Sequence, residues 1–296
     1  MVNTKPLKKK RRVVNGEKIY QIVIVTIISL IVLICLYPLL YILSASLMSA
    51  DEWNARMGVF LIPHKPTLEA YRVVLEQVNL YKAFGVSVSR AVVGALTGVF
   101  MNAVTGYTLS RKKIFGKKVL SVFLFITMIY GGGFIPTYII IAQTNLLNSF
   151  WVYIIPGLLD AWTALVFRQN FLNTPSEIEE SARVDGASEI QIFFRIMLPI
   201  NMPTVSVMLL FAAVSHWNAW FDSMMFIDTN NSSLIPLQLY LKNAFASTGG
   251  GTTGLVIHAE TQKMVVAVIG ILPILCIYPF FQKYFTKGIY SGSVKG

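Results

Sequence analysis

Residues 174–199 read TPSEIEESARVDGASEIQIFFRIMLP and form the longest charged, helix-forming stretch of a mostly apolar chain. Thr174 is expected to cap a helix, with Pro175 at its first position and Glu177 completing a capping box. Gly186 is expected to end this helix, because glycine adopts a left-handed C-terminal cap at the lowest cost. The stretch therefore predicts two short helices joined by a sharp turn.

The second short helix is expected to carry an apolar face. Ser188 and Gln191 repeat the capping-box pattern at its start. Five apolar residues then follow at the i, i+3, i+4, i+7 and i+8 spacing of one helix face, namely Ile190, Phe193, Phe194, Met197 and Leu198. The first helix is acidic and solvated, whereas the second needs a partner for its stripe.

The composition excludes a soluble globular protein, since 55% of the 296 residues are hydrophobic and only 13% are charged. The net charge of +11 raises the question of nucleic-acid binding. However, the basic residues of 5–12 precede an apolar run without interleaved aromatic residues, and those of 111–118 fill a gap between two others. This is the positive-inside pattern of membrane proteins. We expect a membrane protein that binds no nucleic acid.

The apolar runs predict an all-α membrane protein with six transmembrane helices, at residues 19–44, 84–109, 118–144, 150–171, 199–227 and 264–285. The first run is too long for the core of a signal peptide, so it is expected to remain uncleaved. Residues 1–18 form a basic arm, residues 19–296 one membrane domain, and residues 45–83 and 228–263 two outside loops. Most lysines and arginines lie on the side of the termini and of residues 174–199, which places that side in the cytoplasm.

The third predicted span contains Gly131, Gly132 and Gly133, followed by Pro136. Three glycines cost about 3 kcal/mol of helix propensity relative to alanine. An interrupted helix near the membrane midplane is tolerated where protein covers it or where it lines a cavity. The alternative is a close contact between helices through small residues.

Ionisable side chains within spans are costly and usually face a cavity or a partner. Asp160 is the most central of them, and the sequence His216-Trp217-Asn218-Ala219-Trp220-Phe221-Asp222 combines indoles with polar groups. Such chemistry suits the apolar faces and hydroxyl edges of sugars, although a tryptophan belt at the membrane surface is an alternative. The candidate substrate path comprises Arg90, Asp160, Trp162, Trp217, Asn218, Trp220 and Asp222.

Metal binding and catalysis are not expected. Cys35 and Cys276 lie within apolar runs, and the three histidines are scattered along the chain. We expect no catalytic residue, no metal ligand and no cofactor in this chain.

Residues 174–199 also resemble the signature loop of permease subunits of ATP-driven importers. The family pattern is Glu-Ala-Ala, three residues, Gly, nine residues, Ile, one residue and Leu-Pro. It occurs here as Glu180, Ser181, Ala182, Gly186, Ile196, Leu198 and Pro199, and only Ser181 departs from it. Further segments, at 131–138, 216–218, 283–288 and 292–296, resemble the oligosaccharide and polysaccharide branch. This branch includes the second permease subunit of the maltose importer and the lipoprotein-associated sugar permeases of Gram-positive bacteria, and the resemblance covers residues 15–296.

The resemblance implies a type I ABC importer permease fold whose cytoplasmic coupling helix, within residues 174–199, docks into an ATPase subunit. It implies a complex with a second homologous permease, two ATPase subunits that carry ATP and magnesium, and an extracellular, lipid-anchored sugar-binding protein. The expected location is the cell membrane of a Gram-positive bacterium, with both termini in the cytoplasm. The alternatives are the same machine importing a peptide or osmolyte, an ion-coupled secondary transporter, and a membrane scaffold or receptor.

Overall fold

The computed structural model describes residues 13–56, 62–111, 114–228, 232–246 and 259–293, which form helices and loops without a strand among them. They fall into two compact units, Met1–Arg72 with Gly251–Val268 and Val73–Gly250 with Ile269–Gly296. Helices α3 (Glu69–Leu75) and α14 (Ala259–Ser293) contain the boundaries between the units. The all-α fold class predicted from the sequence is confirmed.

The first unit contains α1 (Val13–Ser46) and α2 (Ala50–Arg56). The apolar side chains of α1 are exposed on every side along most of its length, as expected of a helix that crosses a bilayer. The C-terminal residue of α1, Ser46, forms a hydrogen bond of 2.7 Å with the hydroxyl group of Tyr71 in α3. Helix α1 agrees with the first predicted span.

The second unit contains the helices α4 (Val78–Ser110), α5 (Lys117–Ile129), α6 (Phe134–Gln143), α7 (Ala161–Asn173), α8 (Ser176–Val184), α9 (Glu189–Ile192), α10 (Leu198–Ile200), α11 (Met202–Asn218), α12 (Phe221–Phe226) and α13 (Leu237–Ala246). It also contains the 3₁₀ turns η1 (Phe150–Tyr153) and η3 (Ser232–Leu234), and the π-helical turn η2 (Phe193–Met197). The predicted outside loops 45–83 and 228–263 thus hold the helices α2, α3 and α13.

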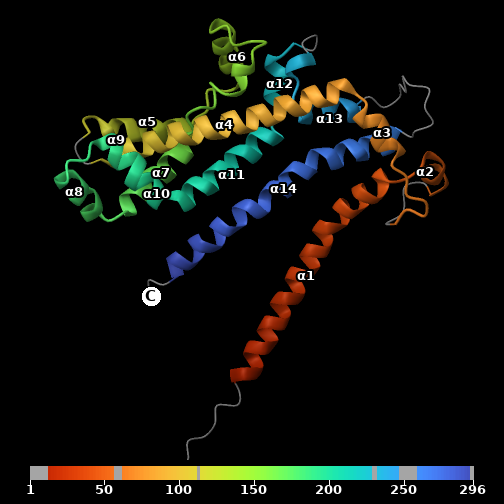
Figure 1. The fold of residues 1–296 in the computed structure, drawn as a ribbon, viewed down its shortest axis with the longest axis horizontal. Coiled ribbons are helices and arrows are strands. Elements are labelled where there is room, and N and C mark those ends of the chain that lie inside the picture. Colours follow the sequence, from red (N-terminus) through yellow and green to blue (C-terminus); the bar gives the residue numbers. More distant parts are fainter. Residues whose placement is uncertain (1–12, 57–61, 112–113, 229–231, 247–258, 294–296) are drawn as a thin grey trace, which may run out of the picture. The chain divides into compact units, whose positions relative to one another are not determined.

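Helix α4 is the centre of the second unit and packs against both α7 and α11 (Figure 1). Gly106 permits the close contact with α7: a Cβ atom there would lie 2.7 Å from the backbone nitrogen of Arg168 and 2.8 Å from the carbonyl oxygen of Ala164. Burial of apolar side chains around this crossing forms the main core of the unit.

The six predicted spans are not six continuous helices. Among the described residues, three stretches are long and apolar enough to cross a membrane unaided: Gly16–Ser46, Val78–Ser110 and Glu260–Ile277. Two further spans would each be a bent pair, α5 with α6 at 116° and α9–α10 with α11 at 81°. The first bend lies at Gly131–Gly133, between the end of α5 and the start of α6. Gly133 adopts a φ of 83°, a conformation that favours glycine.

The prediction of a continuous fourth helix over residues 150–171 is wrong. Only η1 and α7 are helical, and a non-helical segment separates them. Asp160 begins α7 as its N-cap, because its carboxylate accepts a 2.8 Å hydrogen bond from the backbone N–H of Thr163. The Asn102 side chain of α4 bonds the carbonyl oxygen of Leu158 and the N–H of Asp160, at 3.3 and 2.9 Å, which replaces missing helical bonds. Asp160 therefore stands at the start of a helix, not within one.

The fifth predicted helix, residues 199–227, is also interrupted. Helix α11 ends at Asn218, and α12 starts at Phe221 after a turn. The predicted cap at Thr174 is wrong as well: α8 starts at Ser176 behind Pro175, without a side-chain cap. The Thr174 hydroxyl instead accepts a 3.3 Å hydrogen bond from the Asn201 amide, since Asn201 lies at the bend between α10 and α11.

Candidate functional site: the 174–199 segment and the broken helices beside it

The turn between α8 and α9 forms as the sequence predicts. Gly186 adopts a φ of 82°, the left-handed conformation expected of a glycine that ends a helix. The N–H of Ala187 donates to the carbonyl oxygen of Ala182 at 2.9 Å, which closes the last turn of α8. The predicted capping box then starts α9: Ser188 Oγ accepts from the Gln191 N–H, and Gln191 Oε1 accepts from the Ser188 N–H.

The apolar stripe of the second short helix divides between two environments. Helix α9 is followed by the π-helical turn η2, which changes the direction of successive side chains relative to a regular helix. Phe193 and Met197 are buried, whereas Ile190 and Phe194 are 71% and 47% exposed. The prediction of one continuous stripe is therefore wrong.

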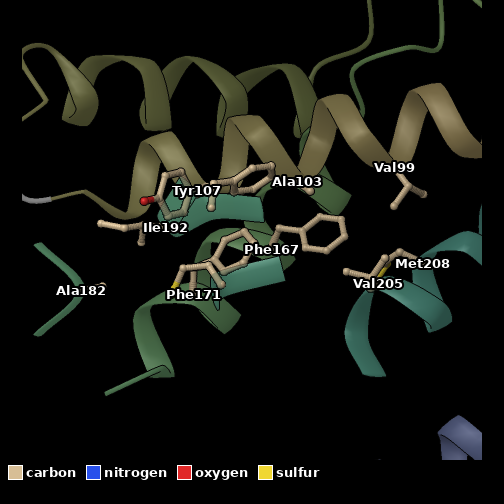
Figure 2. Packing of buried hydrophobic residues seen from close by; sticks show 11 residues of the cluster. Val99, Ala103, Tyr107, Phe167, Phe171, Ala182, Ile192, Val205 and Met208 are labelled. Atoms are coloured by element: carbon tan, nitrogen blue, oxygen red, sulfur yellow. The ribbon is translucent and has the colours of Figure 1, made fainter. Parts of the chain in front are cut away.

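The buried half of the segment is anchored in the core of the second unit (Figure 2). Ala182 and Ile192 lie in the same cluster as Tyr107 of α4 and Phe171 of α7. The ring of Phe193 is 5.0 Å from that of Tyr107, measured between centroids. Ile196 and Leu198 are half-buried against this cluster. The segment is thus fixed by its buried side chains to α4, which is far away in the sequence, and to α7, which directly precedes it.

The exposed half of the segment presents acidic and apolar side chains together. Glu180, Ser181 and Pro199 are exposed, as is Val184 at 87%. Of the seven residues of the signature pattern, Ala182 alone is fully buried. An exposed surface of this kind, on an anchored segment, is suited to docking of a partner protein.

A network of charged groups that sequence reasoning missed links the segment to the end of α4. Both carboxylate oxygens of Glu179 accept hydrogen bonds from the Arg111 guanidinium, which also lies 4.2 Å from the centre of the Tyr107 ring. Arg183 donates to Glu189 at 2.9 Å, and the Tyr107 hydroxyl donates to the other oxygen of Glu189, also at 2.9 Å. In the sequence, Arg111 stands out only as one of several basic residues beside a span, and the one local sign of the network is the i, i+4 pair Glu179–Arg183.

The hydrogen bond between Arg183 and Glu189, which lie outside the spans, favours the charged form of both groups. It raises the pKa of Arg183, and it holds the pKa of the Glu189 carboxyl below its usual value. Both groups are therefore charged near neutral pH.

The break between α11 and α12 is held by an ion pair whose cation is buried. Arg90 of α4 is 1% exposed and pairs with Asp222, and it also donates to the carbonyl oxygen of Ala219 at 3.2 Å. Its guanidinium lies 4.2 Å from the centre of the Tyr153 ring, whose hydroxyl contacts Ser223 Oγ at 2.9 Å. Arg90 and Asp222, two candidate path residues, are brought together here as partners of each other.

The remaining candidate path residues lie apart. Trp217 is buried, and its indole N–H donates to the carbonyl oxygen of Gly270 in α14 at 3.0 Å. The Lys242 ammonium of α13 lies over the Trp220 ring, with its Nζ atom 3.2 Å from the ring centre. Asn218 and Trp162 are exposed. Trp217 contributes to helix packing in this structure, so its replacement would not report on transport alone.

Asp160 lines a cavity of about 220 Å³ between α4, α7 and α11. Polar groups of all three helices line it, and they include Asn102, Thr163 and His216. No His, Cys, Asp or Glu cluster in the described part of the chain is arranged to hold a metal ion. A role of Asp160 in the substrate path stays a prediction, and the structure places this residue at a polar cavity.

Residues 91–290 match the family of binding-protein-dependent transport system inner membrane components. This chain belongs to that family. It is 32% identical over 287 residues to the polygalacturonan/rhamnogalacturonan transport system permease protein YtcP of Bacillus subtilis, covering 95% of this chain and 99% of the relative. It is 35% identical to protein LplC of the same organism, covering 89% of this chain and 90% of the relative.

A solved structure has the same fold. One chain of the crystal structure of a bacterial ABC transporter involved in the import of the acidic polysaccharide alginate matches with a TM-score of 0.85 and 27% identity. The match covers 95% of this chain and all of the other. The predicted resemblance to sugar ABC permeases and the prediction of a membrane-embedded protein are thereby confirmed, and family membership selects an importer subunit over an ion-coupled transporter.

Proposed function

We propose that this family member forms, together with a second homologous permease, the translocation path of an ATP-driven importer of oligosaccharides or polysaccharides. An extracellular, lipid-anchored binding protein delivers the sugar, and two partner ATPase subunits bind ATP and magnesium. Both termini and residues 174–199 lie in the cytoplasm, as the distribution of basic residues suggests.

One observation carries the coupling part of this proposal. Residues 174–199 bury Phe193 and Met197 in the core of α4 and α7 while exposing Glu180, Ile190 and Phe194. A segment that is anchored on one side and docked on the other can pass movement between an ATPase and the helices of the path.

The carbohydrate cargo is supported by the relatives, since YtcP is named for polygalacturonan and rhamnogalacturonan and the solved transporter for the acidic polysaccharide alginate. Arg90 does not supply a cation for an acidic sugar, because it is buried and paired with Asp222. The proposal is therefore limited to carbohydrate in general.

The test is reconstitution of the full complex in liposomes with its binding protein. Uptake and stimulated ATP hydrolysis are measured with oligogalacturonides, alginate and arabinan oligosaccharides, maltodextrins, dipeptides and glycine betaine. We expect stimulation by at least one carbohydrate and by neither the peptides nor the osmolyte. Stimulation by a peptide or by betaine alone would contradict the carbohydrate assignment.

Asp160→Asn is expected to reduce sugar uptake about tenfold, which corresponds to a loss of about 1.4 kcal/mol. Asparagine caps helices about as well as aspartate, so the bond to the Thr163 N–H survives while the charge in the cavity is removed. Asp160→Ala removes both the charge and the hydrogen bond to the Thr163 N–H. Its additional loss of stability relative to Asp160→Asn measures the contribution of the N-cap. Uptake by Asp160→Asn at the unmodified rate would show that the path needs no charge at this cavity.

A further inference from the structure

The charged network between α4 and residues 174–199 joins three segments of the chain. Tyr107 and Arg111 lie at the end of α4, Glu179 and Arg183 belong to α8, and Glu189 starts α9. We call these five residues the α4 clamp. The clamp spans both sides of the Gly186 turn, since Arg183 lies 3.6 Å from Glu179 and 2.9 Å from Glu189.

The clamp differs in kind from the apolar anchor beneath it. Apolar burial is non-directional, so the packing around Phe193 holds the segment against α4 and α7 but specifies its orientation less sharply than a hydrogen-bonded ion pair does. A carboxylate held by both arms of a guanidinium has one favoured orientation. The Glu179 side chain is only 9% exposed, and Arg111 is also stacked on Tyr107, which limits screening by water and salt.

Two further contacts connect the clamp to other parts of the unit. The backbone carbonyl of Arg111 accepts a 2.9 Å hydrogen bond from Lys117 at the start of α5. Tyr107 itself belongs to the core between α4 and α7, where its ring lies 5.7 Å from that of Phe171. A displacement of Glu179 and Glu189 would therefore be opposed by α4, α5 and α7 together.

We propose that the α4 clamp is a set of positioning residues that makes residues 174–199 and α4 move as one body. This inference rests on the proposed function, because it assigns to α4 the role of carrying movement from the docked segment to the cavity and the Arg90–Asp222 pair. The docking surface is separate, since Glu180, Ile190 and Phe194 are exposed and take no part in the clamp.

The experiment compares Arg111→Gln, Glu179→Gln and the exchange Arg111→Glu/Glu179→Arg in the full complex, with Lys118→Gln as control. Lys118 is an exposed cation in the first turn of α5, and it has no part in the clamp. We expect each single variant to retain its ATPase subunits and its unstimulated hydrolysis, while stimulation by binding protein and sugar falls about tenfold. The exchange variant should recover at least half of the stimulation, and the control should match the unmodified complex.

Hydrogen exchange provides a second readout that does not depend on cargo. Amides of residues 179–192 should exchange about tenfold faster in both single variants, whereas those of α11 should be unchanged. If the unmodified complex responds to no carbohydrate, the proposed function fails, yet this comparison still tests the clamp.

Three results would overturn the inference. The first is stimulation within twofold of the unmodified complex in both single variants, and the second is unchanged exchange of residues 179–192. The third is loss of assembly in both single variants and also in an added charge-conserving variant, Arg111→Lys, because these residues would then be needed for folding and not for positioning.

Discussion

Gly186→Val is expected to reduce stimulated ATP hydrolysis at least tenfold while leaving the chain inserted in the membrane. Gly186 has a φ of 82°, a conformation that costs a residue with a side chain about 1–2 kcal/mol and a β-branched residue more. A Cβ atom at this position would meet no atom within 4 Å, so the penalty comes from the backbone and not from a clash. Relief of that strain would change the direction of α9 and of η2, which carry the exposed side chains of Ile190 and Phe194.

The matched control is Gly186→Asn, since asparagine adopts left-handed conformations more readily than any β-branched residue. Stimulation should fall much less in this variant than with valine. The measurement is sugar-stimulated ATP hydrolysis per mole of assembled transporter. Full stimulation in Gly186→Val would mean that the turn is only a connector between two spans.

Gly106→Val is expected to prevent folding of the second unit, and Gly106→Ala to destabilise it strongly. The added Cβ would lie 2.7 Å from the backbone nitrogen of Arg168, and a backbone atom cannot rotate away. Overpacking of this kind costs about 1–3 kcal/mol or more, and here it forces apart the two helices that carry the anchor of residues 174–199. The loss should appear as a lower melting temperature and aggregation of detergent-purified protein.

Gly85→Ala on the same helix is the control, because a Cβ there meets nothing within 4 Å. Alanine should stabilise this exposed helical position by about 0.5–1 kcal/mol. A Gly106→Ala variant that melts like the unmodified protein would show that α4 and α7 can separate without cost, and it would remove the basis for a rigid α4 beneath the segment.

The features that sequence predicted well are local. The turn at Gly186 and the capping box of Ser188 and Gln191 depend on backbone conformations and hydrogen bonds within a few residues. The membrane class follows from composition, because a helix that crosses a bilayer needs apolar side chains regardless of which tertiary contacts they make. Composition alone did not give the number of continuous helices, because breaks such as the one before Asp160 are stabilised by Asn102 from another helix.

The roles of the charged residues were decided by tertiary structure. Arg90 and Asp222 are 132 positions apart, and Arg111 and Glu179 are 68 apart, so no local spacing reveals either pair. A charged residue that the sequence marks as a candidate for the substrate path can equally form an ion pair with a distant residue. Pairing is favoured where the charge is buried, because an unpaired buried charge is costly. Sequence by itself therefore determined the class of protein, its family resemblance and the position of the turn. Only the packing of α4 against α7, α8 and α11 decided which charges are paired within the fold and which lie at a cavity or on an exposed surface.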